Sequence, residues 1–129
     1  MNVLIEPDDT AARLRQYVRE NPDVVYDEYQ YDDELSLNGA CYVLSESYFH
    51  AQGGTGSGLT IYCLSWSDLG GDGTHWFLRD DRAVVDLGLD EREQAANIPY
   101  DVGTRRAFIT GYEPSERTQN VLSALDISY

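Results

Sequence analysis

The sequence predicts a single domain of the α+β class, with a central helix packed on a small antiparallel sheet and further helices on its flanks. Residues 41–51 are apolar or small-polar on all sides, which predicts a buried central helix. Three short runs rich in β-branched and aromatic residues, at 59–66, 74–79 and 83–87, predict the strands. The 129 residues are 42% hydrophobic, which is enough for one domain with a core.

Residues 1–37 precede this core and are expected to form an acidic helix and a loop. The helix is predicted over 9–20, where Leu14 and Val18 give an apolar stripe. Three residues at its start offer N-caps: Asp8, Asp9 and Thr10. The acidic, tyrosine-rich segment 23–37 is expected to be mostly loop, with a short extended piece.

The core of the domain is predicted to span residues 38–111. Its glycine-rich stretch 53–58 ends the central helix and leads into the first strand as a flexible loop. A glycine- and aspartate-rich turn over 68–73 then separates the first two strands.

The rest of the chain predicts two more helices. One is expected over 89–96, followed by irregular or extended chain over 99–111. The C-terminal part, 112–129, is expected to hold a helix that begins at Pro114, because proline suits a first helical position.

The charge of the chain excludes some classes of function. Nine basic residues stand against 23 acidic ones, a net charge of −14, and all nine are arginine. A surface this acidic repels phosphate, which argues against nucleic-acid binding. No apolar run is long enough to cross a membrane, and the N-terminus has no signal-peptide pattern. The sequence therefore predicts a cytoplasmic protein without a membrane or nucleic-acid partner.

Strong acidity without lysine is typical of proteins from a salt-saturated cytoplasm, so the composition resembles haloarchaeal proteins and those of their viruses. At molar salt the self-repulsion of such a surface is screened. An acidic inhibitor that mimics nucleic acid is the alternative. The acids are concentrated in 1–37, which carries a net charge of −7, whereas 38–66 holds one charge, Glu46. We interpret the acidity mainly as a salt-adapted surface.

A possible hairpin brings a histidine and an aspartate together. If Asp80 and Asp81 are the two loop residues, His75 lies directly opposite Asp86, close enough for the carboxylate to orient the imidazole. This register also pairs Arg79 with Arg82, which counts mildly against it. A slip of one residue would put His75 and Asp86 on opposite faces.

Cys41 stands at the predicted start of the central helix. The partial positive charge and free N–H groups of a helix N-terminus both favour a thiolate. The order of Cys41, His75 and Asp86 therefore suits a catalytic triad with a nucleophile, a proton shuttle and an orienting carboxylate. The alternative is a purely structural role, in which Cys41 is an inert buried cysteine and His75 is a hydrogen-bonded core histidine.

In this order of residues, the sequence resembles the papain-like and transglutaminase-like cysteine enzymes. The segment from Gly39 to Gly54, with GTHWFLRD and VVDLG after it, is also similar to small proteins of tailed phages and haloarchaeal viruses. The similarity continues through a Tyr-x-x-Gly-x-Arg-Arg stretch from Tyr100 and a Pro-Ser-x-Arg helix start at Pro114. It covers roughly residues 36–122 and implies a papain/transglutaminase-like core with the Cys-His-Asp triad. The threonine of the family's Asp-Leu-Thr is Gly88 here.

Further residues are candidates for binding substrate. We assign Asn38, Trp76 and Arg105 as candidate oxyanion or substrate-binding residues. Arg105 belongs to the only basic pair, which can clamp an anionic substrate group or pair with the surplus acids. The spacings of the two cysteines and two histidines fit no zinc pattern, so we predict neither a metal nor another cofactor.

Three other residues have ordinary explanations. Cys63, in the middle of a predicted strand, is expected in the core, and His50 is expected to end the central helix. Glu46 could assist at the site or point to solvent or an arginine.

The sequence thus predicts a thiol-dependent enzyme of acyl transfer, either hydrolysis, deamidation or transglutamination of an amide bond in a protein or peptide. The alternative is a non-enzymatic acidic accessory protein, an inhibitor or a minor virion protein with the same fold. Neither the substrate nor the oligomeric state can be read from the sequence.

Overall fold

The fold is described by a computed structural model, which covers residues 2–21, 40–65, 74–89, 91–108 and 111–129. Its elements are, in chain order, β1 (Val3–Leu4), α1 (Asp9–Glu20), α2 (Cys41–Ala51), η3 (Gly54–Gly56), β2 (Thr60–Ser65), β3 (Thr74–Arg79), β4 (Val84–Val85), η5 (Arg92–Asn97), η6 (Tyr100–Val102), β5 (Thr104–Arg105) and α3 (Glu116–Ala124). The η elements are 3₁₀-helices. This is the mixed α+β class that the sequence predicts. The expected loop at 23–37 and turn at 68–73 lie outside the described residues.

The strands form one five-stranded sheet in the order β1-β4-β3-β2-β5. Three of its four pairings are antiparallel, but β1 runs parallel to β4. The expectation of a purely antiparallel sheet is therefore wrong. The parallel strand β1 is only two residues long, too short for a hydrophobic pattern to reveal it in the sequence.

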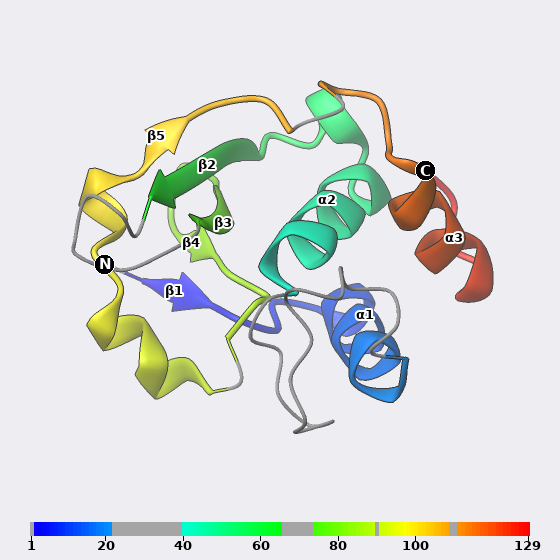
Figure 1. The fold of residues 1–129 in the computed structure, drawn as a ribbon, viewed down its shortest axis with the longest axis horizontal. Coiled ribbons are helices and arrows are strands. Elements are labelled where there is room, and N and C mark those ends of the chain that lie inside the picture. The colour runs from blue at the N-terminus through cyan, green and yellow to red at the C-terminus, as the bar shows by residue number, and fades with distance from the viewer. Residues whose placement is uncertain (1, 22–39, 66–73, 90, 109–110) are drawn as a thin grey trace.

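The helix α2 lies at the centre of the molecule, between the sheet and the other two α-helices (Figure 1). It contacts β3 on one side and both α1 and α3 on the other. Nine of its eleven residues are buried, which explains why its sequence is apolar or small-polar all round. The prediction of a buried central helix over 41–51 is confirmed.

The helix α1 also has the predicted bounds. Its N-cap is Asp8, whose carboxylate accepts a hydrogen bond of 2.9 Å from the backbone N–H of Ala11. Leu14 and Val18 are buried, so the predicted apolar stripe is the face that packs on α2.

The sheet has a hydrophobic cluster on each face. Side chains from alternate positions of β2 and β3 meet α2 and its neighbouring helices on one face: Ile61, Cys63, Trp76 and Leu78. The intervening positions face the other side, where Leu64 and Phe77 pack with Tyr100 and Ile98. His75 shares this second face with Phe77, because the two are separated by one residue along β3.

Two predicted helices differ from the structure. The segment expected as a helix over 89–96 contains the 3₁₀-helix η5 instead. It begins three residues later than expected, after the N-cap Glu91, whose side chain forms a capping box with Gln94. It ends before Ile98, which is extended as the residue before a proline usually is. The last helix, α3, begins at Glu116 rather than at Pro114. Ser115 is its N-cap, because its hydroxyl can accept a hydrogen bond from the N–H of Thr118.

The hairpin between β3 and β4 has a different register from the predicted one. Leu78 pairs with Val85 and Arg79 with Val84, so the loop residues are Asp81 and Arg82. Asp80 opens the turn: its carboxylate accepts hydrogen bonds from the N–H groups of Arg82 and Ala83, at 2.7 and 2.8 Å. The predicted pair of Arg79 and Arg82 does not form.

The register differs from the predicted one by two residues, not by one. A shift of two keeps every side chain on its expected face, because side chains alternate with a period of two. His75 and Asp86 therefore remain on the same side of the sheet, in diagonal rather than directly opposed positions.

None of the helices among the described residues has both the length and the apolar character that crossing a membrane requires.

Candidate active site

Cys41, His75 and Asp86 lie together where α2 and β3 begin. Cys41 is the first residue of α2, and His75 is the second residue of β3. The imidazole of His75 is hydrogen-bonded to Asp86, and the side chain of Cys41 lies close enough to interact with the same ring. The distance from His75 Nε2 to Asp86 Oδ2 is 2.6 Å. The three residues that the sequence order singles out are thus connected, with the histidine between the thiol and the carboxylate.

One nitrogen of the imidazole is held by the carboxylate, because Oδ2 of Asp86 contacts Nε2 of His75. A carboxylate on one nitrogen holds the tautomer and the orientation of the ring, and leaves the other nitrogen to exchange a proton. This is the arrangement that general acid–base chemistry at the sulfur requires.

Burial increases from the thiol to the carboxylate. Cys41 keeps 9% of its surface exposed and His75 keeps 7%, whereas Asp86 has none. An orienting carboxylate works best when water cannot compete for it, while a nucleophile must be reached from outside. The gradient of exposure therefore matches the order of roles that the sequence predicts.

Asp86 accepts three hydrogen bonds from different parts of the chain. Besides His75, the hydroxyl of Tyr100 donates to its Oδ2 at 2.7 Å, and the N–H of Gly88 donates to its Oδ1 at 3.2 Å. A buried carboxylate needs such donors because its charge has lost the solvation of water. Tyr100 was part of the sequence resemblance, but its role at Asp86 was not predicted.

The electrostatics of the site favour a charged histidine. Burial lowers the pKa of His75, but the charge and hydrogen bond of Asp86 and the contacts with Cys41 outweigh it and raise that pKa to about 10. His75 is therefore an imidazolium at neutral pH. Its positive charge lies beside the side chain of Cys41.

The start of α2 adds a second positive influence at the sulfur. The first intrahelical bond runs from the N–H of Leu44 to the carbonyl of Ala40, which leaves the preceding N–H groups of the first turn without helical acceptors. The N-cap, Ala40, has no side-chain acceptor for them. Donors at a helix start can bind an oxyanion that forms next to Cys41.

Gly88 lets the segment after β4 pack tightly against α2. A Cβ atom at this position would lie 2.7 Å from Cβ of Cys41 and 2.9 Å from its Cα. Both distances are closer than real Cβ contacts, so a larger residue would displace the helix start or the carboxylate segment. Glycine is therefore required sterically at this position of the chain.

The other three predicted site residues have different outcomes. Asn38 lies outside the described residues. Trp76 is 5% exposed, and its ring packs edge-on against Tyr42 at a centroid distance of 5.0 Å. It is a core residue on the α2 face of the sheet. Arg105 lies in β5 opposite Tyr62, so it is on the face of the sheet that is away from α2.

The remaining candidates from the sequence are structural. Glu46 is fully buried and accepts hydrogen bonds from the hydroxyls of Ser115 and Thr118, so it anchors the start of α3. The expectation that Glu46 assists at the site or points to solvent is therefore wrong. His50 lies in the last turn of α2, where burial lowers its pKa. Cys63 is a buried free thiol in β2, as expected, and its pKa is raised by burial.

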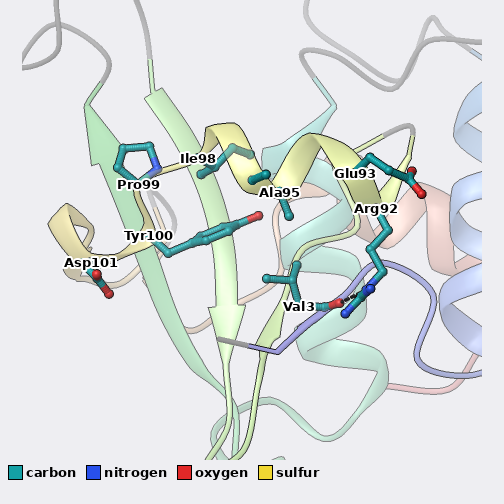
Figure 2. A pocket seen from close by; sticks show the side chains of 9 residues that line it. Val3, Arg92, Glu93, Ala95, Ile98, Pro99, Tyr100 and Asp101 are labelled. Atoms are coloured by element: carbon teal, nitrogen blue, oxygen red, sulfur yellow. Dashed lines mark hydrogen bonds between the residues drawn. The ribbon is translucent and has the colours of Figure 1, made fainter.

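A cavity of about 470 Å³ lies beside η5 (Figure 2). Val3 and Tyr100 line it, and the side chain of Arg92 reaches the carbonyl of Val3 at 3.0 Å. The cavity shares Tyr100 with the hydrogen bonds around Asp86, but Cys41 and His75 do not line it. The cavity is therefore next to the tyrosine that holds Asp86, and it does not adjoin the side chain of Cys41.

Among the residues that the structure describes, no three His, Cys, Asp or Glu side chains are grouped to hold a metal ion. No family model matches this chain, and no curated protein or solved structure matches it significantly.

Proposed function

We propose that this protein is a thiol-dependent enzyme of acyl transfer that acts on an amide bond of a protein or peptide. Cys41 is the nucleophile, His75 is the general acid and base, and Asp86 orients the imidazole. We also propose that the chain has a papain/transglutaminase-like core, in which the first residue of the central helix reacts and the sheet supplies the other two residues. The observation that carries the proposal is the position of His75, which is hydrogen-bonded to Asp86 and interacts with the side chain of Cys41.

The reaction begins with the attack of the Cys41 thiolate on the carbonyl carbon of the amide. A sulfur–carbon bond forms, and the negative charge on the oxygen is stabilised by N–H groups at the start of α2. The imidazolium of His75 then gives its proton to the amide nitrogen, the carbon–nitrogen bond breaks, and the amine leaves. Cys41 is left as a thioester.

The second half of the reaction releases the acyl group. Water or an amine attacks the thioester while neutral His75 takes a proton from it. The carbon–sulfur bond breaks, which restores the thiolate and the imidazolium. Water as the acceptor gives hydrolysis or deamidation, and an amine gives transglutamination.

Three features of the site support this sequence of steps. The cationic His75 stores the proton that the leaving amine needs. The hydrogen bonds from Tyr100 and Gly88 hold Asp86 in place, and the carboxylate itself is fully buried. Cys41 and His75 each keep some exposure, whereas Asp86 has none, so a substrate can reach only the first two.

We propose further that the protein works in the salt-saturated cytoplasm of a haloarchaeon, encoded by the host or by its virus. The net charge of −14 without lysine supports this, because carboxylates retain water and weakly hydrated arginine forms planar ion pairs. The assays below are therefore run at high salt.

The test is the capture of the thioester. The protein is mixed with p-nitrophenyl acetate, an activated ester that acylates reactive thiols, and the acetylated residue is identified by peptide mass spectrometry. We expect acetylation of Cys41 with a burst of p-nitrophenol, and little acetylation of Cys63. Cys41→Ser and His75→Ala should abolish the burst, and Asp86→Asn should slow it strongly.

His50→Ala is the matched control, because His50 is also a buried histidine but lies at the other end of α2. This variant should keep the burst. Equal acetylation of both cysteines, or a burst that survives in His75→Ala, would show that the three residues do not act as a catalytic unit.

A further inference from the structure

Two groups meet at one oxygen of the buried carboxylate. Nε2 of His75 lies 2.6 Å from Oδ2 of Asp86, and the hydroxyl of Tyr100 donates to the same oxygen at 2.7 Å. The other oxygen, Oδ1, accepts a longer bond of 3.2 Å from the N–H of Gly88. Tyr100 therefore contacts the carboxylate at the atom through which Asp86 acts on the imidazole.

The hydroxyl of Tyr100 is the donor in this contact. An ionised carboxylate has no proton to give, so it accepts from a hydroxyl that meets it. Burial and the charge of Asp86 raise the pKa of Tyr100 well above its usual range, so the phenol keeps its proton at neutral and mildly alkaline pH. The hydrogen bond is thus available in both halves of the proposed reaction.

The position of this hydroxyl is fixed by its surroundings. Tyr100 is buried in the second hydrophobic cluster, where its ring packs edge-on against Phe77 at 4.9 Å between centroids. Pro99 precedes it as the N-cap of η6, and the N–H of Gly103 bonds to the carbonyl of Tyr100 at 3.1 Å. A donor that is already held in place does not have to be ordered during the reaction.

A second donor on Oδ2 weakens the hold of Asp86 on the proton of His75. A hydrogen bond to the charged form of an acid stabilises that form, which makes the carboxylate a weaker base. Among the described residues, Asp86 after β4 and Cys41 at the start of α2 raise the pKa of His75. Tyr100 acts on the imidazole through Asp86, because its hydroxyl contacts the carboxylate.

We infer that Tyr100 is a positioning residue of the catalytic unit, and that its hydroxyl holds Oδ2 of Asp86 so that His75 can be neutral in the second half of the reaction. This inference rests on the proposed function for its chemistry. The imidazolium gives its proton to the leaving amine in the first half, whereas the attack of water on the thioester needs a neutral ring. A carboxylate that held the imidazolium too strongly would slow the second half.

The test compares the native protein with Tyr100→Phe in the reaction with p-nitrophenyl acetate. The burst reports the acetylation of Cys41, and the steady rate reports hydrolysis of the thioester. We expect Tyr100→Phe to keep the burst and to slow the steady rate about three- to tenfold near neutral pH, which corresponds to a rise of about 0.5–1 in the pKa of His75. The steady rate should recover as the pH rises, so the midpoint of its pH profile should lie at higher pH in the variant.

Tyr62→Phe is the matched control. Tyr62 packs against the same hydrophobic cluster, with its ring stacked on Phe77 at 5.7 Å between centroids, and the guanidinium of Arg79 lies over it. This variant should leave the burst, the steady rate and the midpoint of the pH profile unchanged. If Tyr100→Phe lowers the burst and the steady rate in equal proportion and leaves the midpoint unchanged, the role of Tyr100 is merely structural and the inference is wrong.

The ¹⁵N chemical shifts of the His75 side chain give its pKa without any reaction, and they separate this inference from the proposed function. If the native protein shows no burst that depends on Cys41, the catalytic proposal fails, but the titration still tests the effect of Tyr100. A higher pKa of His75 in Tyr100→Phe supports the action of the hydroxyl through Asp86. The same pKa in both proteins would overturn it.

Discussion

The hydroxyl of Tyr100 donates a hydrogen bond to Oδ2 of Asp86, the same oxygen that contacts His75. Tyr100 lies in η6, 14 residues after the aspartate along the chain. It links the second hydrophobic cluster of the sheet to the site, because its ring also packs edge-on against Phe77 at 4.9 Å. The C-terminal third of the chain thereby positions a residue of the central hairpin.

Tyr100→Phe removes this hydrogen bond and keeps the ring. Because Asp86 is buried and loses a donor, we expect the free energy of unfolding to fall by about 1.5–3 kcal/mol, the range for a hydrogen bond to a charged group. Chemical denaturation measures the change. Tyr112→Phe is the control, since Tyr112 is 55% exposed and its loss of hydroxyl should cost little. Equal stability of the two variants would show that the Tyr100 hydroxyl contributes nothing.

The two histidines should titrate in opposite directions. Asp86 and Cys41 raise the pKa of His75 to about 10, whereas burial lowers the pKa of His50. At about pH 8, ¹⁵N chemical shifts of the side chains should therefore report an imidazolium at His75 and a neutral ring at His50, each against a usual pKa near 6.5. A neutral ring at both positions at that pH is incompatible with the electrostatics described for the site.

The same shift makes stability depend on pH. The folded pKa of His75 is raised above its unfolded value, so the protonated ring stabilises the fold fully below about pH 6.5. This contribution is lost as the pH rises towards about 10. The difference in unfolding free energy between the native protein and His75→Gln should accordingly be larger at about pH 6 than at about pH 10.

Gly88→Ala tests the tight packing of the carboxylate segment on α2. The new methyl group would lie within 3 Å of Cys41, and the atoms that it meets belong to the helix backbone and Cβ, which cannot rotate away. We expect a loss of about 1–3 kcal/mol in unfolding free energy, the usual cost of overpacking. Gly56→Ala is the matched control, because nothing lies within 4 Å of a Cβ at that glycine. Similar behaviour of the two variants would contradict the close approach.

Salt should stabilise the protein. The net charge of −14 makes the compact state repel itself, and the Debye length falls from about 10 Å at 0.1 M salt to about 3 Å at 1 M. We expect the melting temperature to rise over this range in potassium chloride. The double variant Asp81→Asn with Asp101→Asn neutralises two exposed acids, so its melting temperature should rise less over the same range of salt. A melting temperature that does not increase with salt would refute adaptation to a salt-saturated cytoplasm.

The sequence predicts the long elements well because their patterns are local. The bounds of α1, α2 and β3 agree with the expected ranges, and each is defined by caps, burial or alternation within its own residues. The two-residue strands β1 and β5 are defined by pairing with distant segments instead. No pattern of two residues can predict a partner some 80 residues away, as for Val3 and Val84.

The candidate site was predictable where it depends on the order of residues along the chain and on the alternation of side chains along a strand. The contact of His75 with Asp86 survives an error in the register, because a shift of two residues preserves the face. The hydrogen bond from Tyr100 was not predictable, since it depends on how η6 packs against the sheet. The position of Arg105 on the sheet face away from α2 likewise follows from the register of β5 against β2, which the sequence does not indicate.

The most direct test of the account is the rate at which iodoacetamide alkylates each cysteine at about pH 6. An ordinary thiol with a pKa near 8.5 is then under about 1% thiolate and reacts slowly. With His75 as an imidazolium beside its sulfur, Cys41 should react much faster than Cys63 in the native protein, and His75→Ala should remove this advantage while His50→Ala preserves it. Equal, slow alkylation of Cys41 and Cys63 in the native protein would contradict the account.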